Sequence, residues 1–84
     1  MKRGQENTVE YFLEELNGNI ARLRCYAECK KDRMFYIEID IENKELLKIE
    51  GEDVFGYAGH ATWSSCDKYK ETGIFPEHGF SVWG

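Results

Sequence analysis

Hydrophobic and polar residues alternate along three segments in the middle of the chain. In residues 21–30, ARLRCYAECK, the apolar positions are Ala21, Leu23, Cys25, Ala27 and Cys29. Residues 35–42, FYIEIDIE, alternate in the same way, and so do residues 47–50, LKIE. A period of two is typical of a strand with one buried face and one solvated face. We therefore predict three strands of an antiparallel meander.

The region before these segments shows a different spacing. Its apolar residues recur at intervals of three and four: Val9, Phe12, Leu13 and Leu16. This spacing is typical of one side of a helix. Asn7 or Thr8 can act as the N-cap, Glu10 can complete a capping box, and Gly18 can end the helix. We predict a first helix here.

A second helix is predicted for residues 60–73, HATWSSCDKYKETG, where Trp63, Cys66 and Tyr69 are three apart. Gly73 can adopt the left-handed conformation that ends it. Residues 80–83 are expected to form a short fourth strand or a docked tail. The predicted fold class is α+β: an N-terminal helix, a three-stranded antiparallel meander, a second helix and the C-terminal strand or tail. We expect a single compact domain over residues 1–84.

The order αβββα resembles that of the double-stranded RNA-binding domain. That family is known for a lysine cluster at the start of its second helix. The corresponding stretch here, GHATWSSCDK, has no lysine before Lys68. Because the chain also carries a net charge of −5, RNA binding is not expected to accompany the resemblance.

The faces of the strands lead to a predicted register. If Cys25 lies opposite Ile39, Arg24 faces Asp40 and Arg22 faces Glu42 on the polar side. Ile41 is likewise placed opposite Leu47. Cys25 and Cys29 are expected to be buried against the helix stripe that contains Phe12 and Leu16. Residues four apart on a strand are separated by roughly 13 Å, which excludes a shared zinc ion or a disulfide.

The negative charge is concentrated in one segment. Residues 35–53 carry seven acidic side chains and only two lysines. A strand that bears Glu38, Asp40 and Glu42 in a row accepts self-repulsion, and acidic residues are depleted in sheets. We therefore predict a partner-binding face on the polar side of the sheet. Its expected residues are Glu38, Asp40, Glu42, Tyr36, Tyr26 and Glu50.

Two kinds of chemistry are weighed against this binding face. A zinc site could use Cys25 or Cys29 with His60, Cys66 and His78, but no two of them have a tight ligand spacing. A hydrolase could use Cys66 as a nucleophile with His60 or His78 and Asp67. Neither has a motif around it, so we expect no catalytic residue, no metal and no cofactor. No segment has the apolar length of a signal peptide or membrane span, so we expect a cytoplasmic protein.

The resulting hypothesis is a small acidic binding protein without enzymatic activity. It would dock on a basic surface of a larger protein, such as one that handles nucleic acid. In class it resembles phage-encoded inhibitors of bacterial defence such as anti-CRISPR proteins, some of which mimic the charge of nucleic acid. The alternative is a structural or homo-oligomerising domain with an aromatic interface near the C-terminus. That interface would use Trp63, Tyr69, Phe80 and Trp83.

Overall fold

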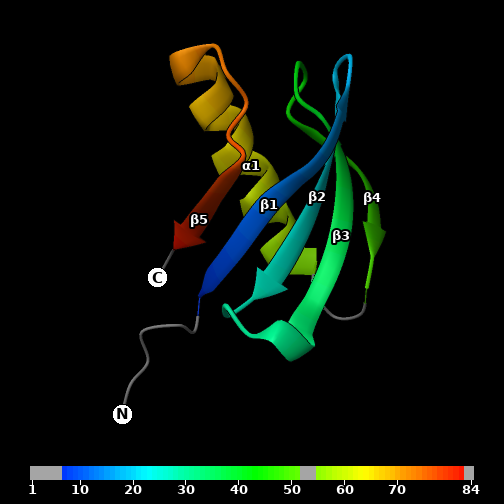
Figure 1. The fold of residues 1–84 in the computed structure, drawn as a ribbon, viewed down its shortest axis with the longest axis vertical. Helices are drawn as coiled ribbons and strands as arrows, with labels where there is room; N and C mark the ends of the chain where they lie inside the picture. Colours follow the sequence, from blue (N-terminus) through cyan, green and yellow to red (C-terminus); the bar gives the residue numbers. More distant parts are fainter. Residues whose placement is uncertain (1–6, 52–54, 83–84) are drawn as a thin grey trace.

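The fold is a five-stranded antiparallel sheet with a helix on one face (Figure 1). A computed structural model describes residues 7–51 and 55–82. The strands are β1 (Thr8–Asn17), β2 (Ile20–Ala27), β3 (Met34–Asp40), β4 (Glu45–Glu50) and β5 (His78–Val82). The helix is α1 (Phe55–Thr72), and a short 3-10 helix, η1 (Lys31–Arg33), precedes β3. The strand order across the sheet is β4-β3-β2-β1-β5.

The predicted N-terminal helix is wrong, because residues 8–17 form β1. Val9 and Tyr11 are buried, whereas Glu10 and Phe12, which alternate with them, point to the other face. Phe12 is apolar although it lies on the polar side of the strand. It therefore made the spacing of apolar residues fit a helix as well as a strand. The β-branched and aromatic residues of TVEYF favour a strand, and pairing with both β2 and β5 fixes it. The αβββα topology, and with it the resemblance to the double-stranded RNA-binding domain, is therefore incorrect.

A tight hairpin joins β1 to β2. Asn17 pairs with Ile20, and Gly18 has a φ of 62° in the turn between them. Gly18 thus has the left-handed conformation expected of it, but it serves a hairpin rather than a helix end. A bulge at Glu14 interrupts the pairing of β1 with β2. Such a bulge increases the local twist of the strand.

The three predicted strands are present as β2, β3 and β4, but their predicted register is wrong. Cys25 lies opposite Phe35 rather than Ile39, and Leu46, not Leu47, is the hairpin partner on β4, opposite Ile39. The predicted pairing of β2 with β3 is displaced by four residues from the observed one. Because four is an even number, the side chains of β2 and β3 keep their predicted faces. The turn through η1 sets the register. The charge pairs used to infer it contribute too little energy to do so.

The predicted second helix is present and begins earlier than expected. It starts at Phe55, five residues before the predicted start at His60, and ends at Thr72. Its buried residues recur at helical spacing: Ala58, Ala61, Thr62, Ser65 and Cys66. Gly73 has a φ of 81°, and its N–H donates to the carbonyl of Tyr69 at 2.7 Å, which confirms the predicted cap.

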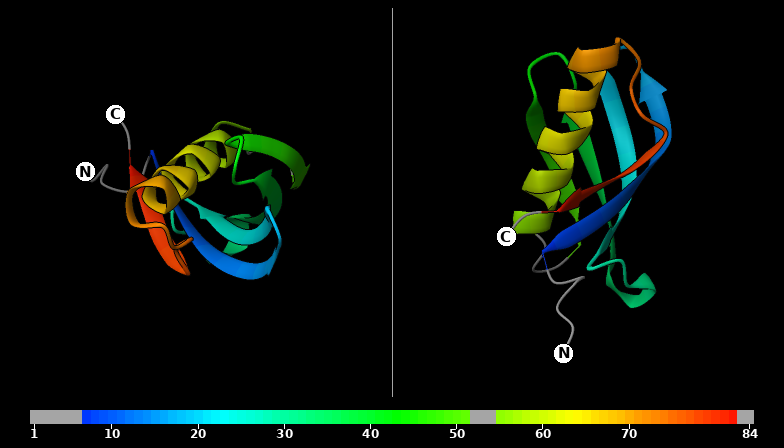
Figure 2. Two further views of the ribbon diagram at one scale, coloured as in Figure 1. Left: turned by 90° about the horizontal axis from the view of Figure 1, so that it is seen from above. Right: turned by 90° about the vertical axis from the view of Figure 1, so that its left-hand side faces the viewer.

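The core lies between α1 and the sheet, which curls around the helix (Figure 2). Fully buried side chains from the central strands form its centre: Tyr11, Leu23, Cys25, Phe35, Ile37 and Ile39. Cys25 is buried as predicted, but it lies in the core between the sheet and α1 and not against an N-terminal helix. Cys29 lies outside β2 in a turn, with a φ of 58°, and is only half-buried. Its predicted place on the strand is therefore wrong.

The predicted C-terminal strand is present as β5, which pairs antiparallel with β1 at one edge of the sheet. It begins at His78, two residues before the predicted start. Trp83 lies outside the described residues. The chain thus returns at its end to the first strand, where Thr8 lies opposite Val82.

Candidate protein-docking face

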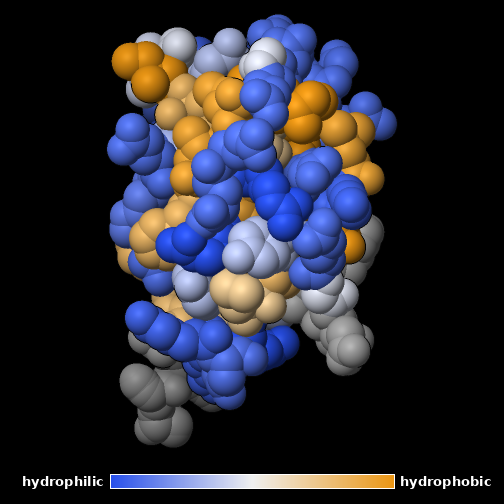
Figure 3. Space-filling model, turned by 45° about the vertical axis from the view of Figure 1, so that its right-hand side comes forward, coloured by the Kyte–Doolittle hydropathy of each residue, from blue (hydrophilic) through white to orange (hydrophobic). Residues whose placement is uncertain are grey.

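The face of the sheet opposite α1 is the candidate docking surface, and we call it the open face. The described residues form no element that covers it (Figure 1). Strand alternation places polar and aromatic side chains from all strands here: Glu10, Phe12, Glu14, Arg22, Arg24, Tyr26, Tyr36, Glu38, Asp40, Glu45, Lys48, Glu50, His78 and Phe80. Figure 3, in which the side bearing β3 and β4 comes forward, shows hydrophilic side chains between smaller hydrophobic areas.

Two of the predicted acidic residues, Glu38 and Glu50, meet at Arg22. Nη1 of Arg22 lies 3.1 Å from Glu38 Oε2, and its Nη2 lies 3.0 Å from Glu50 Oε1. Lys48 approaches Glu50 Oε2 at 3.3 Å. Hydrogen bonds from Arg22 and Lys48 lower the pKa of Glu50. Glu38 and Glu50 are therefore each paired with a basic side chain on the open face.

Asp40 and Glu42 have different surroundings, although the sequence placed them in one row. Asp40 Oδ1 accepts hydrogen bonds from the N–H of Glu42 at 3.0 Å and of Asn43 at 3.2 Å. Its Oδ2 accepts from Asn43 Nδ2 at 2.9 Å, and bonding to Asn43 lowers the pKa of Asp40. Asp40 thus shapes the β3–β4 turn. Glu42 lies beyond β3 and accepts a hydrogen bond from Tyr69 of α1 at 3.4 Å.

The predicted tyrosines both lie on the open face beneath arginines. The guanidinium of Arg22 lies 4.5 Å from the ring centre of Tyr36, and that of Arg24 lies 5.9 Å from that of Tyr26. Arg24 Nε also donates to Tyr26 Oη at 3.0 Å. Arg24 forms an ion pair with Glu14 at the bulge of β1. Stacked arginine and tyrosine side chains are common where proteins bind other proteins.

Beside these pairs, Phe80 forms an aromatic cluster with Phe12 and His78, whereas sequence reasoning had grouped Phe80 with Trp63, Tyr69 and Trp83. Phe12 stacks on His78 with ring centres 4.5 Å apart, and Phe80 lies 5.2 Å from His78. His78 Nε2 lies 2.8 Å from Glu10 Oε2. The available signal was the alternation of His78, Phe80 and Val82, which indicated the strand but not its partner.

The sites considered for chemistry are not brought together. His78 lies on the open face, whereas Cys66 lies on α1 against the opposite face of the sheet. His60 and Cys66 are separated by about 9 Å along the helix axis. Burial raises the pKa of Cys66, which disfavours the reactive thiolate. Within residues 7–51 and 55–82, no group of three possible metal ligands is present.

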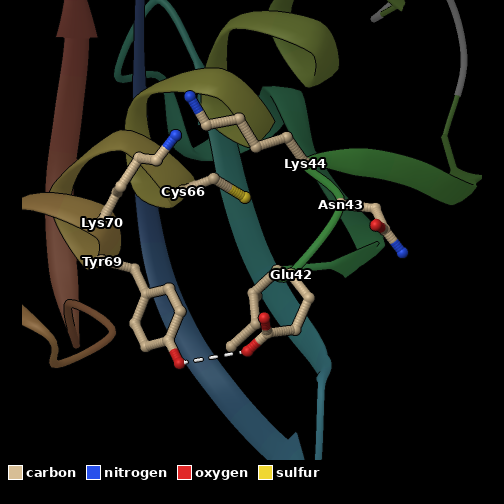
Figure 4. A pocket seen from close by; sticks show the side chains of 7 residues that line it. Glu42, Asn43, Lys44, Cys66, Tyr69 and Lys70 are labelled. Atoms are coloured by element: carbon tan, nitrogen blue, oxygen red, sulfur yellow. Dashed lines mark hydrogen bonds between the residues drawn. The ribbon is translucent and has the colours of Figure 1, made fainter.

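Cys66 adjoins a pocket of about 420 Å³ between the β3–β4 turn and α1 (Figure 4). Lys44 and Lys70 border this pocket, and the Tyr69–Glu42 hydrogen bond crosses its rim. Lys44 also approaches Asp67 at 3.7 Å. The pocket is therefore lined by charges of both signs around a buried thiol, an arrangement without a nucleophile and a base in contact.

Comparisons with known proteins add no functional assignment. No protein-family model, no curated protein and no solved structure matches the chain. In the described part of the chain, no helix has the length and apolar character needed to cross a membrane.

Proposed function

We propose that this protein is a small non-enzymatic binding protein whose open face docks on a basic surface of a larger protein. The observation that carries the proposal is the uncovered sheet face, on which acidic side chains outnumber basic ones. The acids are Glu10, Glu14, Glu38, Asp40, Glu45 and Glu50, and the bases are Arg22, Arg24 and Lys48. A partner that handles nucleic acid has such a basic surface, and the cytoplasm is the compartment this proposal implies.

The arrangement of the open face supports docking in two ways. The excess of carboxylates would attract a basic partner at long range and raise the rate of association. Phe12, Tyr26 and Tyr36 would then supply rigid contact area with little loss of side-chain entropy. Because Arg22 and Arg24 already orient the acids and rings, little reorganisation would be needed on binding.

The test uses two variants with the same change in net charge. Glu38→Lys/Glu45→Lys reverses charge on the open face, and Asp67→Lys/Glu71→Lys reverses it on α1. Asp40 and Glu42 are left intact because they hold the β3–β4 turn and the Tyr69 contact. Capture from a cell lysate should recover basic proteins with the wild type and with the α1 variant, and lose them with the open-face variant. The captured proteins should also be released as salt rises, because screening shortens the reach of charge to about 8 Å at physiological ionic strength.

A defined probe separates docking from general attraction of an acidic protein. An arginine-rich peptide should perturb the amide resonances of β1 to β4 on the open face in the wild type. Equal loss of capture for both charge variants, with shifts spread over α1, would contradict a dedicated face.

A further inference from the structure

The outer edge of β5 directs backbone groups away from the rest of the sheet. The N–H of Leu13 donates to the carbonyl of Glu77 at 2.9 Å, which makes these two residues a hydrogen-bonded pair of the antiparallel ladder. Hydrogen-bonded pairs alternate with non-bonded pairs. Gly79 and Ser81 therefore bond to β1, whereas His78, Phe80 and Val82 direct their backbone groups away from it. The weak bond from Ser64 Oγ to the carbonyl of Phe80, at 3.4 Å, agrees with this direction.

The two edges of the sheet differ in how they are protected. The β4 edge carries Glu45, Lys48 and Glu50, and a bulge interrupts its pairing with β3 near Leu47. Charges and bulges are the usual protection of an edge strand against further pairing. The β5 edge, HGFSV, has no acidic residue, no lysine, no proline and no bulge. It instead exposes 51% of Phe80 and 70% of Val82.

A groove of about 330 Å³ runs between this edge and α1. Trp63, which is 61% exposed, borders it from the helix side. Lys68 and Glu71 border it as well. An added strand at β5 would thus cover the exposed side chains of both the strand and the helix.

We propose that β5 pairs antiparallel with β5 of a second copy of this chain, about a two-fold axis at Phe80. This register sets Phe80 against Phe80 and His78 against Val82, with all of these side chains on the open face. The strand itself carries no fixed charge, so two chains of net charge −5 can approach each other there. The axis also brings Lys68 and Glu71 of each copy toward the junction, which places both signs of charge on each side. The result is a ten-stranded sheet with both helices on one face.

The test is the mass of the full chain in solution as a function of concentration. Sedimentation or light scattering should give about twice the 9.8 kDa chain mass at high concentration, falling to the single mass on dilution. Val82→Pro removes an N–H that points away from β1, so it should leave the monomer folded and abolish the dimer. Val82→Lys removes no N–H and should weaken the dimer by charge repulsion. Leu47→Lys, an equivalent exposed position near the β4 edge, should leave the dimer unchanged.

Three results would overturn the proposal. These are a wild type that stays monomeric at all concentrations, a dimer that survives both Val82 variants, and a dimer that is lost in Leu47→Lys. Circular dichroism and thermal unfolding at low concentration show whether each variant is folded. If Val82→Pro does not fold, the Val82→Lys result decides.

Discussion

Tyr11 and Gly79 lie opposite each other on β1 and β5, and the tyrosine ring covers the glycine. A Cβ atom at position 79 would lie 2.5 Å from Tyr11 Oη and 2.7 Å from its Cζ. Tyr11 is buried, and its hydroxyl lies 3.5 Å from Ser64 Oγ of α1. Gly79 is therefore required for space, and it allows one side chain to join β1, β5 and the helix.

We predict that Gly79→Ala lowers the free energy of unfolding by about 1–3 kcal/mol, because the added methyl group overpacks the Tyr11 contact. Urea unfolding followed by circular dichroism measures this change. The matched control is Gly59→Ala on α1, where an added Cβ meets nothing within 4 Å. The control should gain about 0.5–1 kcal/mol from helix propensity. Equal effects of the two substitutions would show that Tyr11 does not cover Gly79.

At the scale of the elements, β3 is the central support of the core. Its inward residues Phe35, Ile37 and Ile39 are almost fully buried, and β2 and β4 pair with it on either side. The adjacent strand β4 is largely exposed, with Leu47 near its outer edge. Truncation of apolar side chains should therefore cost much more on β3 than on β4.

We predict that Ile39→Ala destabilises the fold by roughly 2–5 kcal/mol, the usual range for a buried isoleucine. Leu47→Ala, at a side chain that is 48% exposed, should cost less than about 1 kcal/mol. Chemical denaturation of both variants beside the wild type gives the comparison. A similar cost at the two positions would mean that Ile39 does not face α1.

Whether an element could be predicted depends on how far apart in the sequence its interacting residues lie. β2 and β3 were predictable because each buries every second residue, and the end of α1 was predictable from Gly73. β1 was not, because its partner β5 lies at the other end of the chain and Phe12 places an apolar ring on the open face. The Gly18–Asn19 pair, which forms the two-residue hairpin loop, was a turn signal that the helix interpretation overlooked.

The same limit applies to the candidate site. Alternation correctly placed Glu38, Glu50, Tyr26 and Tyr36 on the polar side of the sheet. The pairing of Glu38 and Glu50 through Arg22 depends on strand register, which the turns determine and which charge patterns do not reveal.

At the scale of the whole molecule, stability should depend on pH through carboxylates held at three places. Tyr57 and Lys30 donate to Glu28, Asn43 donates to Asp40, and Arg22 donates to Glu50; the pKa of each carboxyl is lowered. A pKa that is lower in the folded state means that the unfolded state binds protons first. The three carboxylates therefore contribute fully to the free energy of unfolding at pH values above their unfolded pKa values. This contribution is lost as the pH falls through their pKa values in the folded state.

We predict that the free energy of unfolding of the wild type declines between about pH 5 and pH 3. Asp40→Asn lacks one of these groups, so its decline should be shallower. Urea titrations at a series of pH values measure both proteins. The two curves should converge as pH falls, and parallel curves would contradict the role of Asp40 in the turn.

The pairing of β1 with β5 also has a consequence for the order of events during synthesis. β1 leaves the ribosome first, and its β2 side can be paired as soon as the hairpin emerges. Its other side must wait until residues 78–82 are made, since Val9 and Tyr11 pair with Ser81 and Gly79 of β5. A nascent chain therefore keeps an open edge on β1, the neighbour of the central strand β2, until β5 has been made. Premature termination just before His78 would leave that edge permanently unpaired, in a protein that has already formed most of its core.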